Sequence, residues 1–68
     1  MKCPDKCSGG DASRQRDLSP GEKHQIPEAI AAKATSRCSY CGCVYDGNGL
    51  VYGTLNNDIL GEGWHPRS

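Results

Sequence analysis

The sequence predicts a small α+β domain whose stability depends on something besides its hydrophobic core. The chain has 68 residues, of which 35% are apolar, and it contains nine Gly, four Pro and no Phe. A chain of this size and composition buries too little apolar surface to fold by core packing alone. Its cysteines form two close pairs, Cys3-x3-Cys7 and Cys38-x2-Cys41, which lie far apart in the sequence. Local patterns between and after these pairs predict one short helix and one β-hairpin.

The two cysteine pairs predict a metal site. Short Cys-x2–4-Cys spacings let one turn of backbone supply two thiolates from the same side, and zinc accepts four thiolates at tetrahedral corners. We therefore expect one Zn²⁺ ion to be bound by Cys3, Cys7, Cys38 and Cys41. A set of four sulfurs also suits iron, which is the alternative metal. In either case the ion is the staple that joins distant parts of the chain.

The expected cellular compartment favours a metal over disulfides. Cys3 follows almost directly after Met1, without the apolar h-region of a secretory signal, and no run approaches the length of a membrane span. We therefore expect a cytoplasmic protein outside the membrane, where thiols stay reduced. The odd total of five cysteines agrees with four ligands and one spare thiol.

The first half of the chain carries helix signals after a polar segment. Residues 8–18 combine small, polar and charged types and predict a mobile loop. The segment 19–22, Ser-Pro-Gly-Glu, matches a capping box and predicts a short helical turn. Pro27 then predicts the start of the main helix, at about 27–35, because a proline inside a helix removes a hydrogen bond. The expected buried stripe of this helix consists of residues at intervals of four, namely Ile26, Ile30 and Ala34.

The second half carries strand and turn signals. Two β-prone runs flank an Asp-Gly-Asn-Gly turn and predict a β-hairpin at about 43–55. Gly42 directly follows the second cysteine pair, where glycine lets backbone N–H groups turn toward the sulfurs. The large apolar side chains of the last segment, Ile59, Leu60 and Trp64, are expected to form a lid over the hairpin. We expect residues 1–68 to form a single domain.

The segment Cys38-x2-Cys41-Gly42-x-x-Tyr45 resembles the zinc-ribbon and rubredoxin-like group, whose knuckles read Cys-x2-Cys-Gly before a β-hairpin. The first pair departs from this pattern, because three residues separate its cysteines and Ser-Gly follows them in place of the usual glycine. The helix between the two knuckles also departs from the minimal pattern. The resemblance implies a zinc ribbon with a structural metal, without an open coordination position, and with the same four cysteine ligands. It implies no particular activity, because zinc ribbons occur in many unrelated roles.

Three further residues offer alternatives to this ligand set. Cys43 would share a strand face with Cys41 and is able to replace Cys41 or Cys7, but we expect it to pack as a small apolar residue beside the site. His24 and His65 are each able to complete a site of three cysteines and one histidine. Because four cysteines already satisfy zinc, we expect both histidines to lie on the surface or in loops.

Charge and motifs favour a non-catalytic module. Eight basic and eight acidic residues give a net charge of zero, and four thiolates around a divalent cation would add negative charge, which disfavours a general grip on phosphate backbones. The chain has no paired-carboxylate or Ser-His-Asp arrangement, and four thiolates leave no place for water at zinc, so we expect no enzyme. We expect a zinc-binding protein–protein interaction or accessory module.

Two alternatives use the same metal site differently. One is a rubredoxin-like iron electron carrier. The other is a nucleic-acid-binding zinc ribbon, in which a tyrosine stacks on a base. Because the chain contains no Phe, we expect the tyrosines and Trp64 to pack in the core and not to stack on bases. Phosphate contacts in the nucleic-acid alternative would come from the basic residues Arg14, Arg16, Lys23, Lys33 and Arg37.

Overall fold

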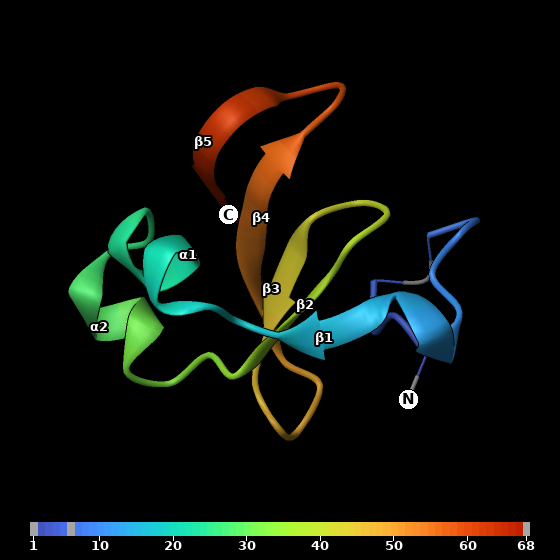
Figure 1. The fold of residues 1–68 in the computed structure, drawn as a ribbon, viewed down its shortest axis with the longest axis horizontal. Coiled ribbons are helices and arrows are strands. Elements are labelled where there is room, and N and C mark those ends of the chain that lie inside the picture. Colours follow the sequence, from blue (N-terminus) through green and yellow to red (C-terminus); the bar gives the residue numbers. More distant parts are fainter. Residues whose placement is uncertain (1, 6, 68) are drawn as a thin grey trace.

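A five-stranded antiparallel sheet, with its strands in sequence order, forms the centre of the structure (Figure 1). The computed structural model describes residues 2–5 and 7–67. Each strand pairs with its neighbour in sequence, and the connection between the first two strands contains two helices. The strands are β1 (Gln15–Asp17), β2 (Ser36–Cys38), β3 (Cys43–Tyr45), β4 (Val51–Asn57) and β5 (Gly61–Pro66).

The first helix, α1 (Pro20–His24), begins with the predicted capping box. The Ser19 hydroxyl accepts a hydrogen bond from the backbone N–H of Glu22, and the Glu22 carboxylate accepts one from the backbone N–H of Ser19. Two backbone N–H groups that a helix start leaves unpaired are thereby satisfied.

The second helix, α2 (Glu28–Ala31), is shorter than the predicted range of about 27–35. After Ala31 the chain continues as a turn, in which the Ile30 carbonyl accepts from the N–H groups of Lys33 and Ala34. The predicted buried stripe is nevertheless present, because Ala34 is buried and Ile30 packs against the same apolar cluster. Within the described part of the chain, both helices fall far short of what a bilayer crossing requires.

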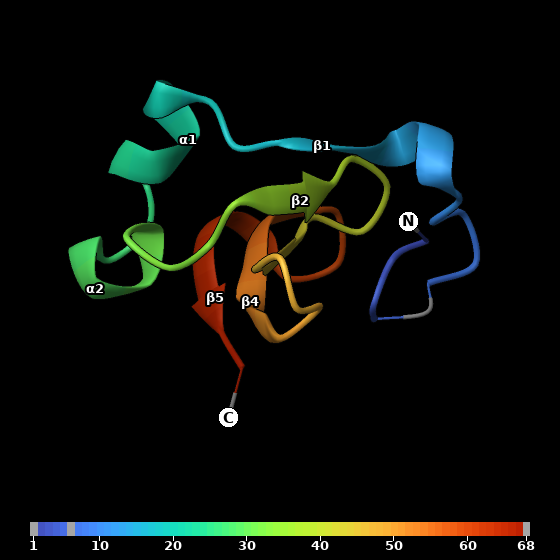
Figure 2. The ribbon, with the colours of Figure 1, turned by 90° about the horizontal axis from the view of Figure 1, so that it is seen from below.

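Residues 8–18, which were predicted to form a loop, contain two short regular elements. They contain one turn of 3-10 helix, η1 (Ala12–Arg14), followed by β1. β1 is a polar edge strand that forms through its backbone, with Gln15 opposite Cys38 and Asp17 opposite Ser36. In Figures 1 and 2, β1 runs between the helices at one end and the N-terminal loop at the other.

The predicted hairpin at about 43–55 is formed by β3 and β4, but the predicted lid is wrong. The last segment forms β5, which pairs antiparallel with β4. Ile59 and Leu60 lie in the turn between these strands, where 92% and 56% of their surfaces are exposed. Trp64 lies opposite Leu55 and its ring packs on Gly53, where a Cβ atom would come within 2.7 Å of the ring.

The interior has an apolar part and a sulfur-rich part. The buried members of the apolar part are Leu18, Ile26, Ala34, Val44 and Leu55. The sulfur-rich part consists of Cys3, Cys38 and Cys43 together with Tyr45, and Cys7 and Cys41 pack against it. Three of the nine buried apolar residues are cysteines, so the packing of this interior would depend on anything that their thiols bind. This division fits the prediction that the apolar core alone is too small.

Candidate metal centre

The first cysteine pair is held by a tight N-terminal loop. The N–H of Cys3 donates to the Gly10 carbonyl at 2.8 Å, and the N–H of Gly10 donates to the Cys7 carbonyl at 3.2 Å. A Cβ atom on Gly10 would lie 2.4 Å from the Cβ of Cys3 and 2.6 Å from the Sγ of Cys7. Gly10 therefore lets the backbone pass beside both cysteines, a role that the sequence alone did not indicate.

The second pair lies in the turn between β2 and β3. Cys38 ends β2, and its carbonyl accepts from the N–H of Gly42 at 2.8 Å, which closes the turn that contains Cys41. Gly42 has φ of +81°, and a Cβ atom there would lie 2.5 Å from the carbonyl oxygen of Leu55. Both its conformation and its close contact require glycine, as expected for this position of the knuckle.

The fold brings the two pairs together. The Sγ atoms of Cys3, Cys7, Cys38 and Cys41 all lie within 4.8 Å of one another. The Cys3–Cys41 and Cys7–Cys38 sulfur distances are both 3.7 Å. A tetrahedral site with metal–sulfur bonds of about 2.3 Å has sulfur–sulfur edges of about 3.8 Å. The cluster is thus suited to hold one metal ion, and four thiolates are acceptable to both zinc and iron.

Cys43 is a buried neighbour of this cluster. Its Sγ lies 3.3 Å from that of Cys3, and its side chain is fully buried on β3. This distance is shorter than a tetrahedral edge of about 3.8 Å. Cys3 and Cys43 are therefore in direct contact.

The electrostatic environment singles out Cys38. Burial would raise the pKa of its thiol, but hydrogen bonds from the N–H of Cys41, the Gln15 amide and the N–H of Tyr40 outweigh burial and lower the pKa to about 6. Gln15 is fixed in turn by the Tyr45 hydroxyl, which donates to its Oε1 at 2.7 Å. The role of Gln15 depends on the pairing of β1 with β2, and the sequence alone did not indicate it.

Three other cysteines behave in the opposite way. Burial raises the pKa of Cys7 to about 12, and neighbouring thiols add to this increase. Burial likewise raises the pKa of Cys41 and of Cys43 to about 12. Without a cation, Cys38 is therefore the cysteine whose thiolate these hydrogen bonds stabilise. A bound divalent cation would supply the positive charge that lets further thiols ionise.

Two of the basic residues predicted to contact phosphate, Arg16 and Arg37, form ion pairs with the same carboxylate, that of Glu22. Arg37 is buried, and its guanidinium donates to the Glu22 carboxylate and to the Leu55 carbonyl. Arg16 also donates two hydrogen bonds to the Glu22 carboxylate. Arg37 is thus an interior residue, and the prediction that it contacts phosphate is wrong, because its side chain is buried and both terminal nitrogens of its guanidinium already have partners inside the protein.

The other predicted contacts lie on the surface. Arg14 sits over the ring of Tyr40, 5.3 Å from the ring centroid, and Lys23 and Lys33 are exposed. His24 is exposed on α1, and the Nε2 of His65 lies 3.1 Å from the Gly61 carbonyl oxygen. Neither histidine belongs to the four-cysteine cluster.

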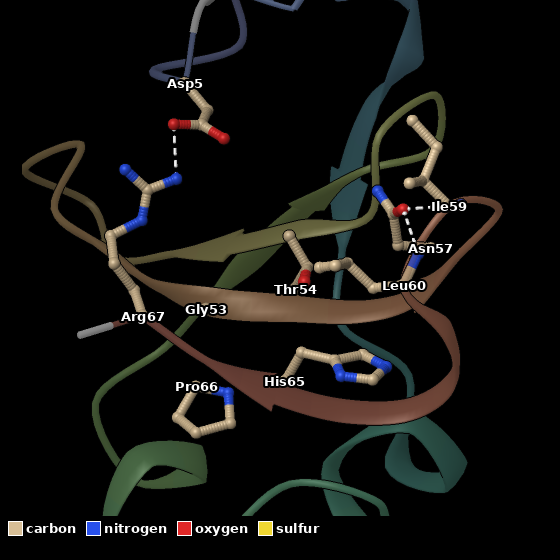
Figure 3. A pocket seen from close by; sticks show the side chains of 9 residues that line it. All are labelled: Asp5, Gly53, Thr54, Asn57, Ile59, Leu60, His65, Pro66 and Arg67. Atoms are coloured by element: carbon tan, nitrogen blue, oxygen red, sulfur yellow. Dashed lines mark hydrogen bonds and ion pairs between the residues drawn. The ribbon is translucent and has the colours of Figure 1, made fainter.

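Asn57 connects the cysteine cluster to the turn between β4 and β5. Its Nδ2 donates to the Cys41 carbonyl at 2.7 Å. Its Oδ1 accepts from the N–H groups of Ile59 and Leu60 at 2.8 and 2.9 Å, as Figure 3 shows. Asparagine often accepts hydrogen bonds within turns, but its contact with the knuckle is a tertiary one that the sequence did not reveal.

Comparison with known proteins gave no match, whether to protein-family models, to curated proteins or to solved structures. The likeness to zinc ribbons therefore rests on the Cys38-x2-Cys41-Gly42 segment alone. What the structure shows is a small α+β fold with a five-stranded antiparallel sheet and a cluster of cysteines suited to a metal ion.

Proposed function

We propose that this protein is a non-catalytic zinc-binding module whose single ion holds the N-terminal loop against the sheet. The observation that carries the proposal is the clustering of four thiol sulfurs within 4.8 Å, since pairs in contact are separated by 31 and 38 residues of sequence. Zinc is favoured because closed four-thiolate sites are typical of structural zinc. Four protein ligands leave no position for a reacting water, so the site supports structure better than hydrolysis.

Native mass spectrometry of the reduced protein, beside a denatured control, tests the metal site. We expect one zinc ion per chain under native conditions and none after denaturation. The Cys41→Ser variant should lose the ion, whereas the matched Cys43→Ser variant should keep it. Folded, reduced protein without a bound metal would contradict the proposal. Visible absorption by the purified protein would show that the bound metal is iron and not zinc.

The exposed turn at Ile59 and Leu60 supports a role in binding another protein. These two large apolar side chains are exposed to solvent, although the core of the molecule contains few large apolar residues. A groove of about 450 Å³ lies beside them, and the ion pair of Arg67 with Asp5 lies along the same groove (Figure 3). Exposed apolar side chains next to a groove are a common mark of interaction sites.

The charges around this turn indicate the kind of partner. Asp58 and Glu62 flank Ile59 and Leu60 in sequence and are exposed. An acidic rim around an apolar tip is complementary to an apolar pocket bordered by lysine or arginine. It is not complementary to an anionic membrane surface, which attracts basic segments. We therefore favour a protein partner with a basic rim.

Site-specific photo-crosslinking in cell extract tests this surface. A photoreactive residue at Leu60 should give one discrete crosslinked product that disappears when the metal is chelated, because Asn57 ties the turn to the Cys41 knuckle. Leu50, which is 58% exposed in the β3–β4 loop, is a matched control position. The same crosslinked products from both positions, or none from Leu60, would contradict a binding role for the turn.

A further inference from the structure

We propose that Cys3 and Cys43 are an oxidation site, at which peroxide converts two thiols of the cluster into a disulfide and thereby expels the metal ion. This reaction presupposes the metal site proposed above, and it gives Cys43 a function of its own. The proposal starts from the position of Cys3, which has two close sulfur neighbours. The Sγ of Cys43 lies 3.3 Å away, and that of Cys41 lies 3.7 Å away.

The shorter of these distances favours Cys43 as the final disulfide partner. A disulfide bond requires the two sulfurs to approach to about 2.05 Å, and the Cys3–Cys43 pair needs less movement than the Cys3–Cys41 or Cys7–Cys38 pair. Cys43 also lies outside the four-cysteine ligand set. Its thiol is therefore not engaged by the ion.

The oxidant enters at a different cysteine. Cys3 and Cys43 are buried, whereas Cys7 and Cys41 are partly exposed and line a surface hollow of about 600 Å³. Hydrogen peroxide is small enough to enter such a hollow. Cys41 is the better entry point, because its sulfur also lies next to Cys3.

The chemistry passes from Cys41 through Cys3 to Cys43. The Cys41 sulfur attacks a peroxide oxygen, the O–O bond breaks, a sulfenic acid forms and hydroxide leaves as water after taking up a proton. The Cys3 sulfur then attacks the Cys41 sulfur, the S–O bond breaks and a second water leaves.

Exchange completes the sequence. The Cys43 thiol attacks the Cys3 sulfur, the bond between Cys3 and Cys41 breaks, and the departing Cys41 sulfur takes up the proton that Cys43 loses. In sum, two thiols and one hydrogen peroxide give one disulfide and two water molecules. With Cys3 oxidised, three cysteines of the ligand set remain, and the ion is released. Reduction by a dithiol in the presence of zinc restores the cluster.

The test uses the full-length, zinc-loaded protein, whose bound ion is first verified by native mass spectrometry. The protein is treated with hydrogen peroxide, its free thiols are alkylated, and tandem mass spectrometry assigns each disulfide while a chromophoric chelator records released zinc. We expect Cys3–Cys43 to be the main disulfide, to appear together with zinc release, and to be reversed by dithiothreitol and zinc. The Cys43→Ala variant should bind zinc but stop at a Cys3–Cys41 disulfide.

Three results would overturn the proposal: a main product linking Cys7 to Cys38, a wild-type reaction that ends at Cys3–Cys41, or zinc release without a disulfide. The wild-type disulfide map decides the matter even if the Cys43→Ala variant fails to fold. A reduced, folded protein without bound zinc would instead refute the proposed metal site, and this is seen before any peroxide is added.

Discussion

At the scale of single residues, the interior contains an ion pair between Glu22 on α1 and Arg37 on β2. Burial would raise the pKa of the Glu22 carboxyl, but hydrogen bonds from Arg37 and from Ser19 lower the pKa to about 2. Arg16 completes the arrangement from β1. The pair joins the helices to the sheet at a place where the apolar core is small.

Replacing Glu22 by Gln tests this ion pair. Because the pKa of Glu22 in the folded protein is about 2, below its ordinary value of 4.5, the carboxylate stabilises the fold fully above pH 4.5, and this contribution is lost as pH falls through about 2. We expect Glu22→Gln to lower the free energy of unfolding at neutral pH by about 2–3 kcal/mol.

Chemical denaturation of metal-loaded wild-type and variant proteins, from neutral pH into the acid range, measures this contribution. Because acid also releases the metal, the comparison covers the pH range in which both proteins keep their ion. Within that range the difference should be constant above about pH 4.5 and shrink below it. An unchanged free energy of unfolding in Glu22→Gln at neutral pH would contradict the assigned role of Glu22.

A second prediction at this scale concerns the requirement for glycine at position 42. The φ of Gly42, which is +81°, and its contact with the Leu55 carbonyl oxygen both disfavour a side chain. We expect Gly42→Ala to lower the free energy of unfolding by about 2 kcal/mol or more and to weaken zinc binding. At Gly47 a Cβ atom would meet no atom within 4 Å, so Gly47→Ala is the matched control and should be nearly neutral. Equal effects of the two substitutions in thermal unfolding would show that the knuckle does not require glycine.

At the scale of elements, those with local signals could be predicted, and those made by strand pairing could not. The capping box of α1 and the Gly-rich turn between β3 and β4 are each specified by residues that are neighbours in the sequence, and both are present. β1 is a polar segment, and β5 contains two glycines with positive φ and a proline, so both resemble loops in the sequence. They become strands because β2 and β4 offer backbone partners.

The candidate site divides in the same way. The spacing of Cys38 and Cys41 is a local signal, and so is the glycine that follows them. The contacts made by Gly10, Gln15 and Asn57 arise only when segments distant in sequence meet. These residue types are common in loops and turns, so their presence in the sequence does not indicate such contacts. The roles of these three residues around the cysteine cluster are therefore visible only in the structure.

Asn57 provides the prediction at this scale, because it ties the β4–β5 turn to the Cys41 knuckle. Asn57→Ala removes the acceptor for two N–H groups of the turn and the donor to the Cys41 carbonyl. We expect faster hydrogen exchange at the amides of Ile59 and Leu60, and a free energy of unfolding lower by about 1–3 kcal/mol. Asn48→Ala, in the exposed β3–β4 loop, is the control. Unchanged exchange at Ile59 and Leu60 would mean that the turn is held by other contacts.

At the scale of the whole molecule, a metal ion bound in the sulfur-rich part of the interior would link folding to metal binding. Structural zinc contributes about 10–16 kcal/mol in small finger peptides at neutral pH, more than a small apolar cluster supplies. The thiols must be deprotonated to bind the ion, so acid should release the metal and unfold the protein together. Chelation at neutral pH should have the same effect without a change of pH.

The most direct measurement is the amide NMR spectrum of the reduced protein during chelation and readdition of zinc. We predict that the dispersed signals collapse when the ion is removed and return in full with one equivalent of Zn²⁺. The Cys38→Ser variant should lack the dispersed signals throughout, while Cys43→Ser should show them with zinc. A dispersed spectrum that persists in metal-free protein would contradict the claim that one ion bound by four cysteines holds this fold together.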